Sequence, residues 1–189
     1  MGFHMTLEPI LVEFTLDERE AWFSGERSDC ICEYCRRLPG TKGFGEYVVG
    51  KYWEQRGYRW IHHDFNVLGG NRPGRWEESE AVVLNALGPD RLAAARTLYK
   101  ALMPFREEHH NPAEEPDLLI YKPGTTEIRF AECKRADTRD TINTRQALGI
   151  YLLGALLRLP VDVFLVAEKG TCSSPDPIVF AYPEGRRLP

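Results

Sequence analysis

Residues 116–134 constrain the fold of this chain more than any other stretch, because two short apolar runs flank a turn. The first run, at 116–121, reads Pro-Asp-Leu-Leu-Ile-Tyr, and the second, at 127–134, reads Glu-Ile-Arg-Phe-Ala-Glu-Cys-Lys. Pro123 and Gly124 lie between the runs, and these residue types are typical of a tight connection. The stretch therefore predicts a β-hairpin.

Three charged side chains of this hairpin are expected to lie close together. Asp117 opens the first strand, and Glu132 and Lys134 lie two residues apart on the second. Because side chains alternate along a strand, Glu132 and Lys134 share one face and Cys133 points the other way. Asp117 and Glu132 can approach each other across the hairpin, where two carboxylates repel unless a cation lies between them. Their oxygens suit Mg²⁺ or Mn²⁺, and the lysine can bind a phosphate or a water.

This arrangement resembles the PD-(D/E)xK nuclease motif, here Pro116-Asp117 followed by Glu132-x-Lys134. It is most similar to the VRR-NUC branch, in which Pro-Asp-Leu-Leu, a hairpin and a Glu-x-Lys strand precede a helix that carries a glutamine. Here that glutamine is Gln146, in a helix expected to run to about residue 159. The resemblance covers residues 114–158, with a looser match at 43–66.

The resemblance implies a restriction-endonuclease-like α/β fold, a mixed sheet flanked by helices, within one domain at 1–189. It also implies that Asp117, Glu132 and the main-chain carbonyl of Cys133 hold one or two divalent ions. Lys134 would position or deprotonate the attacking water, and Gln146 would orient the lysine or the water.

Glu46 is a further candidate for the metal shell. Residues 43–57 are expected to form a helix closed by Gly57, with Glu46, Val49 and Trp53 on one face at helical spacing. Packing that face on the sheet points Glu46 inward, where an unpaired charge is costly and a metal offsets the cost. Many PD-(D/E)xK families carry a glutamate at this place. The alternative is a solvated first-turn glutamate favoured by the helix dipole.

A cluster of Cys30, Cys32 and Cys35 lies in the N-terminal extension expected at 6–42. Close thiolates suit zinc, but a closed zinc site needs four ligands. The candidate histidines, which include His62 and His63, are not at a standard second-pair spacing. A loop of reduced cysteines, a structural zinc site and redox chemistry therefore all stay open. His62 and His63, on a strand expected at 58–68, are predicted to point to opposite faces.

Residues 69–113 are expected to be a helical insertion before the motif core at 114–182. Helices are predicted at 77–87 and 90–105. The second carries an apolar stripe that could serve as core or as a homodimer face. That stripe consists of Leu92, Ala95, Leu98, Tyr99 and Leu102.

Five arginines are expected to contact a nucleic-acid backbone. Three belong to the loop and helix start after the hairpin, and two open the insertion, where a helix N-terminus and guanidinium groups attract phosphate. They are Arg135, Arg139 and Arg145, followed by Arg72 and Arg75.

The composition fits a soluble globular protein, with 43% hydrophobic and 28% charged residues. No apolar run is long enough for a membrane span, and the first residues do not read as a secretory signal. We therefore expect a protein of the cytoplasm or nucleoid that is not secreted. The net charge of −4 argues against indiscriminate binding of polyanions.

Together these features predict a metal-dependent nuclease, foremost a structure-selective DNA endonuclease related to phage, defence or repair. One alternative is a catalytically silent factor that binds nucleic acid or protein on a nuclease-like fold. Another is a nuclease that acts on RNA.

Overall fold

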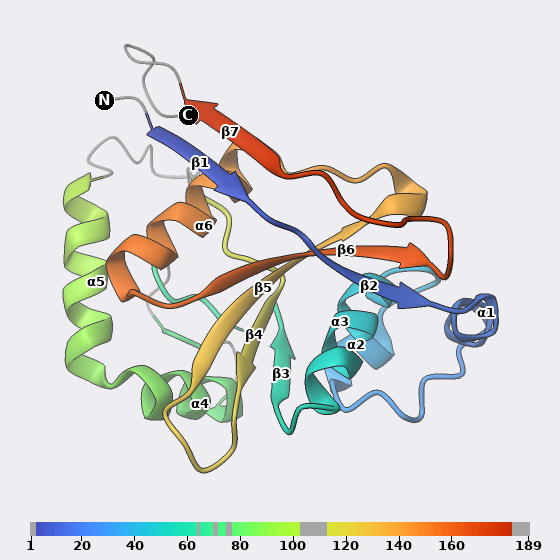
Figure 1. Cartoon of the computed structure of the whole chain (residues 1–189). Coiled ribbons are helices and arrows are strands. Elements are labelled where there is room, and N and C mark those ends of the chain that lie inside the picture. The colour runs from blue at the N-terminus through green and yellow to red at the C-terminus, as the bar shows by residue number, and fades with distance from the viewer. Residues whose placement is uncertain (1–2, 64, 70–71, 75–76, 103–112, 183–189) are drawn as a thin grey trace.

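The computed structural model describes residues 3–63, 65–69, 72–74, 77–102 and 113–182 (Figure 1). It confirms the predicted α/β class, because helices flank a mixed five-stranded sheet with the strand order β2-β6-β5-β4-β3. The first three strands in that order are parallel, and β4 and β3 run antiparallel to their neighbours. The strands are β2 (Ile10–Phe14), β6 (Val161–Glu168), β5 (Ile128–Arg135), β4 (Leu118–Tyr121) and β3 (Arg59–His62).

The predicted hairpin is confirmed as β4 and β5. Leu118 pairs with Ala131, and the pairing continues to Tyr121 opposite Ile128. Gly124 takes a positive φ of 74° in the connecting turn, a conformation that glycine adopts without steric cost. The hairpin therefore places the residue before Leu118 next to the residue after Ala131.

Helices cover both faces of the sheet (Figure 1). One core cluster contains residues of α1 (Leu16–Ser24), α2 (Glu33–Arg37) and α3 (Phe44–Glu54) packed on the strands. The other contains residues of α4 (Glu77–Leu87), α5 (Pro89–Leu102) and α6 (Thr144–Leu157). Buried side chains on both faces explain why β6 is nearly continuously apolar.

Close packing fixes α3 against the sheet. A Cβ at Gly50 would lie 2.2 Å from the ring of Trp60, so this position of the helix accommodates no larger side chain. Phe44, Val49 and Trp53 are buried on the same helix, as its predicted apolar face requires. Gly57 ends the segment with a φ of 81°.

The N-terminal segment contributes a strand to the five-stranded sheet. β2 pairs in parallel with β6, and Phe14 at its end is buried. Thr15 caps α1 in a capping box with Glu18. β1 (Phe3–Leu7) pairs antiparallel with β7 (Ile178–Tyr182) in a separate two-stranded sheet.

The apolar stripe of α5 divides between core and surface. Leu92, Ala95 and Tyr99 are buried in the cluster that α5 shares with α6. Leu98 and Leu102 are 53% and 55% exposed, so these two positions do not cover the sheet. Positions 103–105 of the predicted helix lie outside the described residues.

None of the helices in the described part of the chain is long and apolar enough to cross a membrane.

Candidate active site

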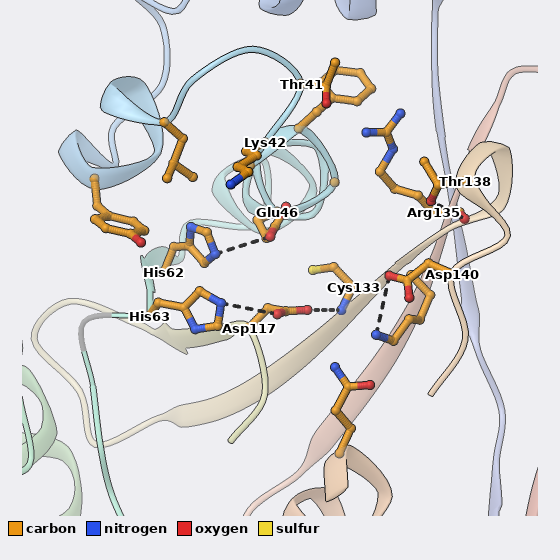
Figure 2. A pocket seen from close by; sticks show the side chains of 17 residues that line it. Thr41, Lys42, Glu46, His62, His63, Asp117, Cys133, Arg135, Thr138 and Asp140 are labelled. Carbon is orange, nitrogen blue, oxygen red and sulfur yellow. Dashed lines mark hydrogen bonds and ion pairs between the residues drawn. The ribbon is translucent and has the colours of Figure 1, made fainter. Parts of the chain in front are cut away.

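A pocket of about 510 Å³ lies where the ends of β3, β4 and β5 meet the first turns of α3 and α6 (Figure 2). The predicted catalytic residues Glu46, Asp117, Lys134 and Gln146 line it, together with Cys133. Two helices direct their N-terminal turns to the pocket, and such ends carry a partial positive charge that favours anions. The fold thus brings together residues from across the chain.

Asp117 is held at the entrance of β4 by two contacts. Its Oδ2 accepts a hydrogen bond of 2.9 Å from the main-chain N–H of Cys133, and its Oδ1 lies 3.6 Å from His63 Nε2. Burial and the charge of Glu46 raise the pKa of Asp117 to about 6. Because Leu118 pairs with Ala131, Asp117 lies at the position opposite Glu132, as the hairpin spacing predicts.

Glu132 and Lys134 share one face of β5, as predicted. Lys134 Nζ lies 2.9 Å from Glu132 Oε1 as an ion pair, and Glu132 is only 1% exposed. Apart from this lysine, no hydrogen-bond donor reaches either carboxylate oxygen among the described residues. Burial and the nearby Asp117 raise the pKa of Glu132 to about 8.

Lys134 keeps its charge in this buried place. Burial alone lowers the pKa of a lysine, but the charge and contact of Glu132 outweigh it, and the pKa lies above its ordinary value. Asp140 adds a second partner, because its Oδ2 lies 3.5 Å from Lys134 Nζ. The lysine is therefore a charged donor.

Glu46 points inward, as its place on the packed face of α3 predicts. Its Oε1 lies 3.2 Å from Nε2 of His62 (Figure 2). Burial raises the pKa of a carboxyl, but the contact and charge of His62 outweigh it and hold the pKa of Glu46 below its ordinary value. Glu46 is thus a partly buried first-turn residue of α3 whose side chain faces the pocket.

The prediction that His62 and His63 point to opposite faces is wrong. Both line the pocket, with ring centroids 4.4 Å apart. The strand ends at His62, and His63 adopts a positive φ of 51°, so the alternation of a strand stops there. Desolvation and the charge of His62 lower the pKa of His63 to about 4, although its side chain is half exposed.

Gln146 reaches the pocket from the first turn of α6. Its side-chain Oε1 accepts a hydrogen bond of 3.2 Å from the main-chain N–H of Asn143, and Asn143 in turn caps the helix. The amide oxygen is therefore occupied by the helix start. The NH₂ group is the part of Gln146 that suits a role toward Lys134 or a water.

Among the predicted arginines that the structure describes, Arg135 lines the pocket and the others do not. Arg135 is among the described residues that line the pocket and pairs with Asp137 at 2.5 Å, whereas Arg139 and Arg145 are not among them. Arg145 Nη1 lies 3.1 Å from Glu114 Oε1. Arg72 pairs with Glu80 of α4, and Arg75 lies outside the described residues.

Sequence reasoning missed several pocket residues. Lys42 and Thr41 come from the loop before α3, and Thr138 and Asp140 come from the loop after β5. A lysine directly before a glycine that begins a helix is a signal that could have identified Lys42, since helix starts attract anions. The loop residues after β5 gave no comparable signal.

The donor set fits a hard divalent cation, although the side chains are not yet arranged around one. In the parts of the chain that the structure describes, no group of three or more histidine, cysteine, aspartate or glutamate side chains is placed to hold a metal ion. Glu132 nevertheless presents a buried carboxylate, paired with Lys134, beside a second carboxylate, Asp117. Carboxylate oxygens of this kind suit Mg²⁺ or Mn²⁺.

Fold and pocket thus define an α/β protein with a buried lysine and acidic groups at one end of a mixed sheet. Comparison of the chain with protein-family models, with curated proteins and with solved structures gave no match.

Proposed function

We propose that the protein is a divalent-metal-dependent nuclease that hydrolyses phosphodiester bonds, and that DNA is its substrate. The observation that carries the proposal is the placement of Asp117, Glu132 and Lys134 on one hairpin, where the buried Glu132 carboxylate is paired with Lys134. The order α3, β3, β4, β5, α6, β6 supports a restriction-endonuclease-like core. The cytoplasm or nucleoid is the corresponding location.

Asp117 and Glu132, with the main-chain carbonyl of Cys133, would hold Mg²⁺ or Mn²⁺. When bound, such an ion lowers the pKa of its water and stabilises the charge of the transition state. Protons must leave Glu132 and Asp117 for this to happen, because burial raises both pKa values. Metal binding should therefore strengthen as the pH rises through neutrality.

Lys134 acts in this scheme as a donor. Its Nζ is charged and fixed between Glu132 and Asp140, so it orients the attacking water and offsets charge that develops on the phosphate. A charged ammonium cannot take a proton, which favours this role over deprotonation of the water. Gln146 would supply its NH₂ group from the first turn of α6.

The rim of the pocket offers contacts for a phosphate backbone. Arg135 and Lys42 both line it, next to the N-terminal turns of two helices. A local set of cations explains how a chain of net charge −4 can bind a polyanion. Binding through these groups should weaken as salt concentration rises.

The test is cleavage of supercoiled plasmid with Mg²⁺ or Mn²⁺, compared with excess EDTA. Asp117→Asn, Glu132→Gln and Lys134→Ala should each lower the rate by roughly a hundredfold or more, since each removes a metal or transition-state contact. Lys122→Ala, on the exposed hairpin turn, is the matched control and should cut normally.

Cleavage that is equally fast in EDTA would contradict the proposal. Binding of DNA with no cleavage in either metal would instead support a catalytically silent binding factor. Cleavage of single-stranded RNA but not DNA would change the substrate class and leave the site assignment standing.

A further inference from the structure

The three N-terminal cysteines meet in one buried cluster. Cys30, Cys32 and Cys35 are 2%, 8% and 0% exposed, and all three are free thiols. The Cys30 thiol donates to the main-chain carbonyl of Cys32, 3.6 Å away, and all three side chains belong to one core cluster. The three thiols are therefore buried in the same part of the core.

His62 supplies a fourth group from β3. Its Nδ1 lies 2.9 Å from Cys35 Sγ, and its Nε2 lies 3.2 Å from the Glu46 carboxylate. The Nε2 edge of the ring thus faces a carboxylate, and the Nδ1 edge faces the thiols. Metal-binding histidines show this pattern, with the second ring nitrogen donating to a carboxylate.

The loop that carries the cysteines is held in place by Arg27. Its buried guanidinium donates to the main-chain carbonyls of Trp22 and Cys35, at 3.1 and 3.3 Å, and also to those of Leu38 and Gly40. The same guanidinium lies over the ring of Trp22. These contacts tie the cysteine loop to the end of α1 and to the segment before α3.

Three cysteine sulfurs and one imidazole nitrogen are a ligand set that structural zinc sites use, and binding would release the thiol protons.

We propose that Cys30, Cys32, Cys35 and Nδ1 of His62 bind one Zn²⁺, and that Glu46 orients His62 from the candidate active-site pocket. Among the described residues, these side chains are not spaced to hold a metal ion as they stand. Zinc bond lengths and a tetrahedral angle place a sulfur and a nitrogen ligand roughly 3.6 Å apart, against 2.9 Å between Cys35 Sγ and His62 Nδ1. Binding would lengthen this contact by less than about 1 Å.

This assignment answers the question that spacing leaves open, because the fourth ligand comes from a strand distant in sequence. It also connects the zinc site to the pocket through one histidine, whose two nitrogens face the thiols and Glu46. The zinc assignment itself does not depend on the proposed nuclease activity.

The first test is elemental analysis of the full chain purified without chelator or added metal. About one zinc per chain is expected, since structural sites take four protein ligands. After exchange into Co²⁺, the folded wild-type protein should show sulfur-to-cobalt charge transfer and the strong visible bands of a tetrahedral centre. The cobalt spectrum of the wild-type protein tests the zinc assignment even if the cysteine variants fail to fold.

Variants assign the ligands. His62→Asn and Cys35→Ser should lose most of the zinc and change the cobalt spectrum, whereas Cys172→Ser and His63→Asn should keep both. Cys172 is a free cysteine outside the cluster, and His63 is the adjacent histidine that faces Asp117. Full zinc content in a folded His62→Asn protein would overturn the assignment. A metal-free wild type with titratable thiols, or with a Cys32–Cys35 disulfide, would do the same.

Discussion

The Glu132 carboxylate occupies a place that is unfavourable for a charge unless a cation joins it. It is almost fully buried, no donor other than Lys134 reaches its oxygens among the described residues, and Asp117 lies beside it. A single lysine contact only partly offsets that cost. A divalent ion would explain why the chain keeps two carboxylates there.

Stability without metal should depend on pH through Glu132. Its pKa of about 8 in the fold exceeds its ordinary 4.5, so its contribution is fully present below about pH 4.5 and is lost as pH rises through 8. Urea unfolding at pH 5 and pH 8 should show wild type losing on the order of 1–3 kcal/mol more than Glu132→Gln over this range. Saturating Mg²⁺ should reduce the loss, because the ion replaces the proton.

Glu20→Gln, an exposed position on α1, is the control for this experiment and should follow wild type. Parallel pH profiles for wild type and Glu132→Gln would show that the burial of Glu132 does not perturb its ionisation.

The site residues that the sequence predicts are those fixed by local geometry. Glu132 and Lys134 share a face because they are two apart on one strand, and Asp117 follows from the hairpin register. The contacts of His62 with Cys35 and Glu46 join segments far apart in the chain, so no spacing indicates them. A strand pattern likewise does not predict that a non-glycine residue such as His63 adopts a positive φ.

At the scale of elements, α6 positions the segment that leads into Asp117. The main-chain N–H of Glu114 donates to the carbonyl of Arg145, 3.0 Å away, and a Cβ at Gly149 would lie 1.7 Å from the Glu114 carbonyl oxygen. Helix and segment are therefore in backbone contact. Only glycine permits that approach.

Gly149→Ala should destabilise the protein by about 1–3 kcal/mol or more, because backbone cannot move aside as a flexible side chain does. It should also slow cleavage by displacing Asp117. Gly154→Ala on the same helix is the matched control, since its Cβ would meet nothing closer than 3.9 Å. That change should be neutral or stabilise by up to about 1 kcal/mol. Thermal unfolding of both variants checks this, and equal melting temperatures would contradict the packing account.

Elements with a clear local pattern could be predicted, and their long-range pairing could not. The hairpin, α6 and β6 follow from turn residues, caps and apolar runs. The parallel pairing of β2 with β6 joins residues 10–14 to 164–168, and nothing in either strand specifies the other. For the same reason, the sequence alone did not decide whether Leu98 and Leu102 of α5 lie in the core or on the surface.

At the scale of the whole molecule, the exposed part of α5 suits a homodimer contact. Leu98 and Leu102 are more than half exposed, next to buried residues of the same stripe. If two copies pair there, each contributes the same surface, and two active sites can cut both strands of a duplex. Leu98→Glu should then give a folded monomer that nicks plasmid without linearising it.

Sedimentation at several protein concentrations measures this directly. Leu92→Glu is the matched control, because Leu92 is buried and its replacement should unfold the protein. A wild type that sediments as a monomer at high concentration would exclude the dimer.

The central claim is that Asp117 and Glu132 form one divalent-metal site, and a crystal soaked in Mn²⁺ tests it most directly through anomalous scattering. The account predicts a manganese peak bound by oxygens of both carboxylates and the Cys133 carbonyl, at roughly 2.0–2.4 Å. The same soak of Asp117→Asn crystals should lose that peak. Manganese that binds elsewhere in the wild type, with the Glu132 carboxylate still paired only to Lys134, would contradict the account.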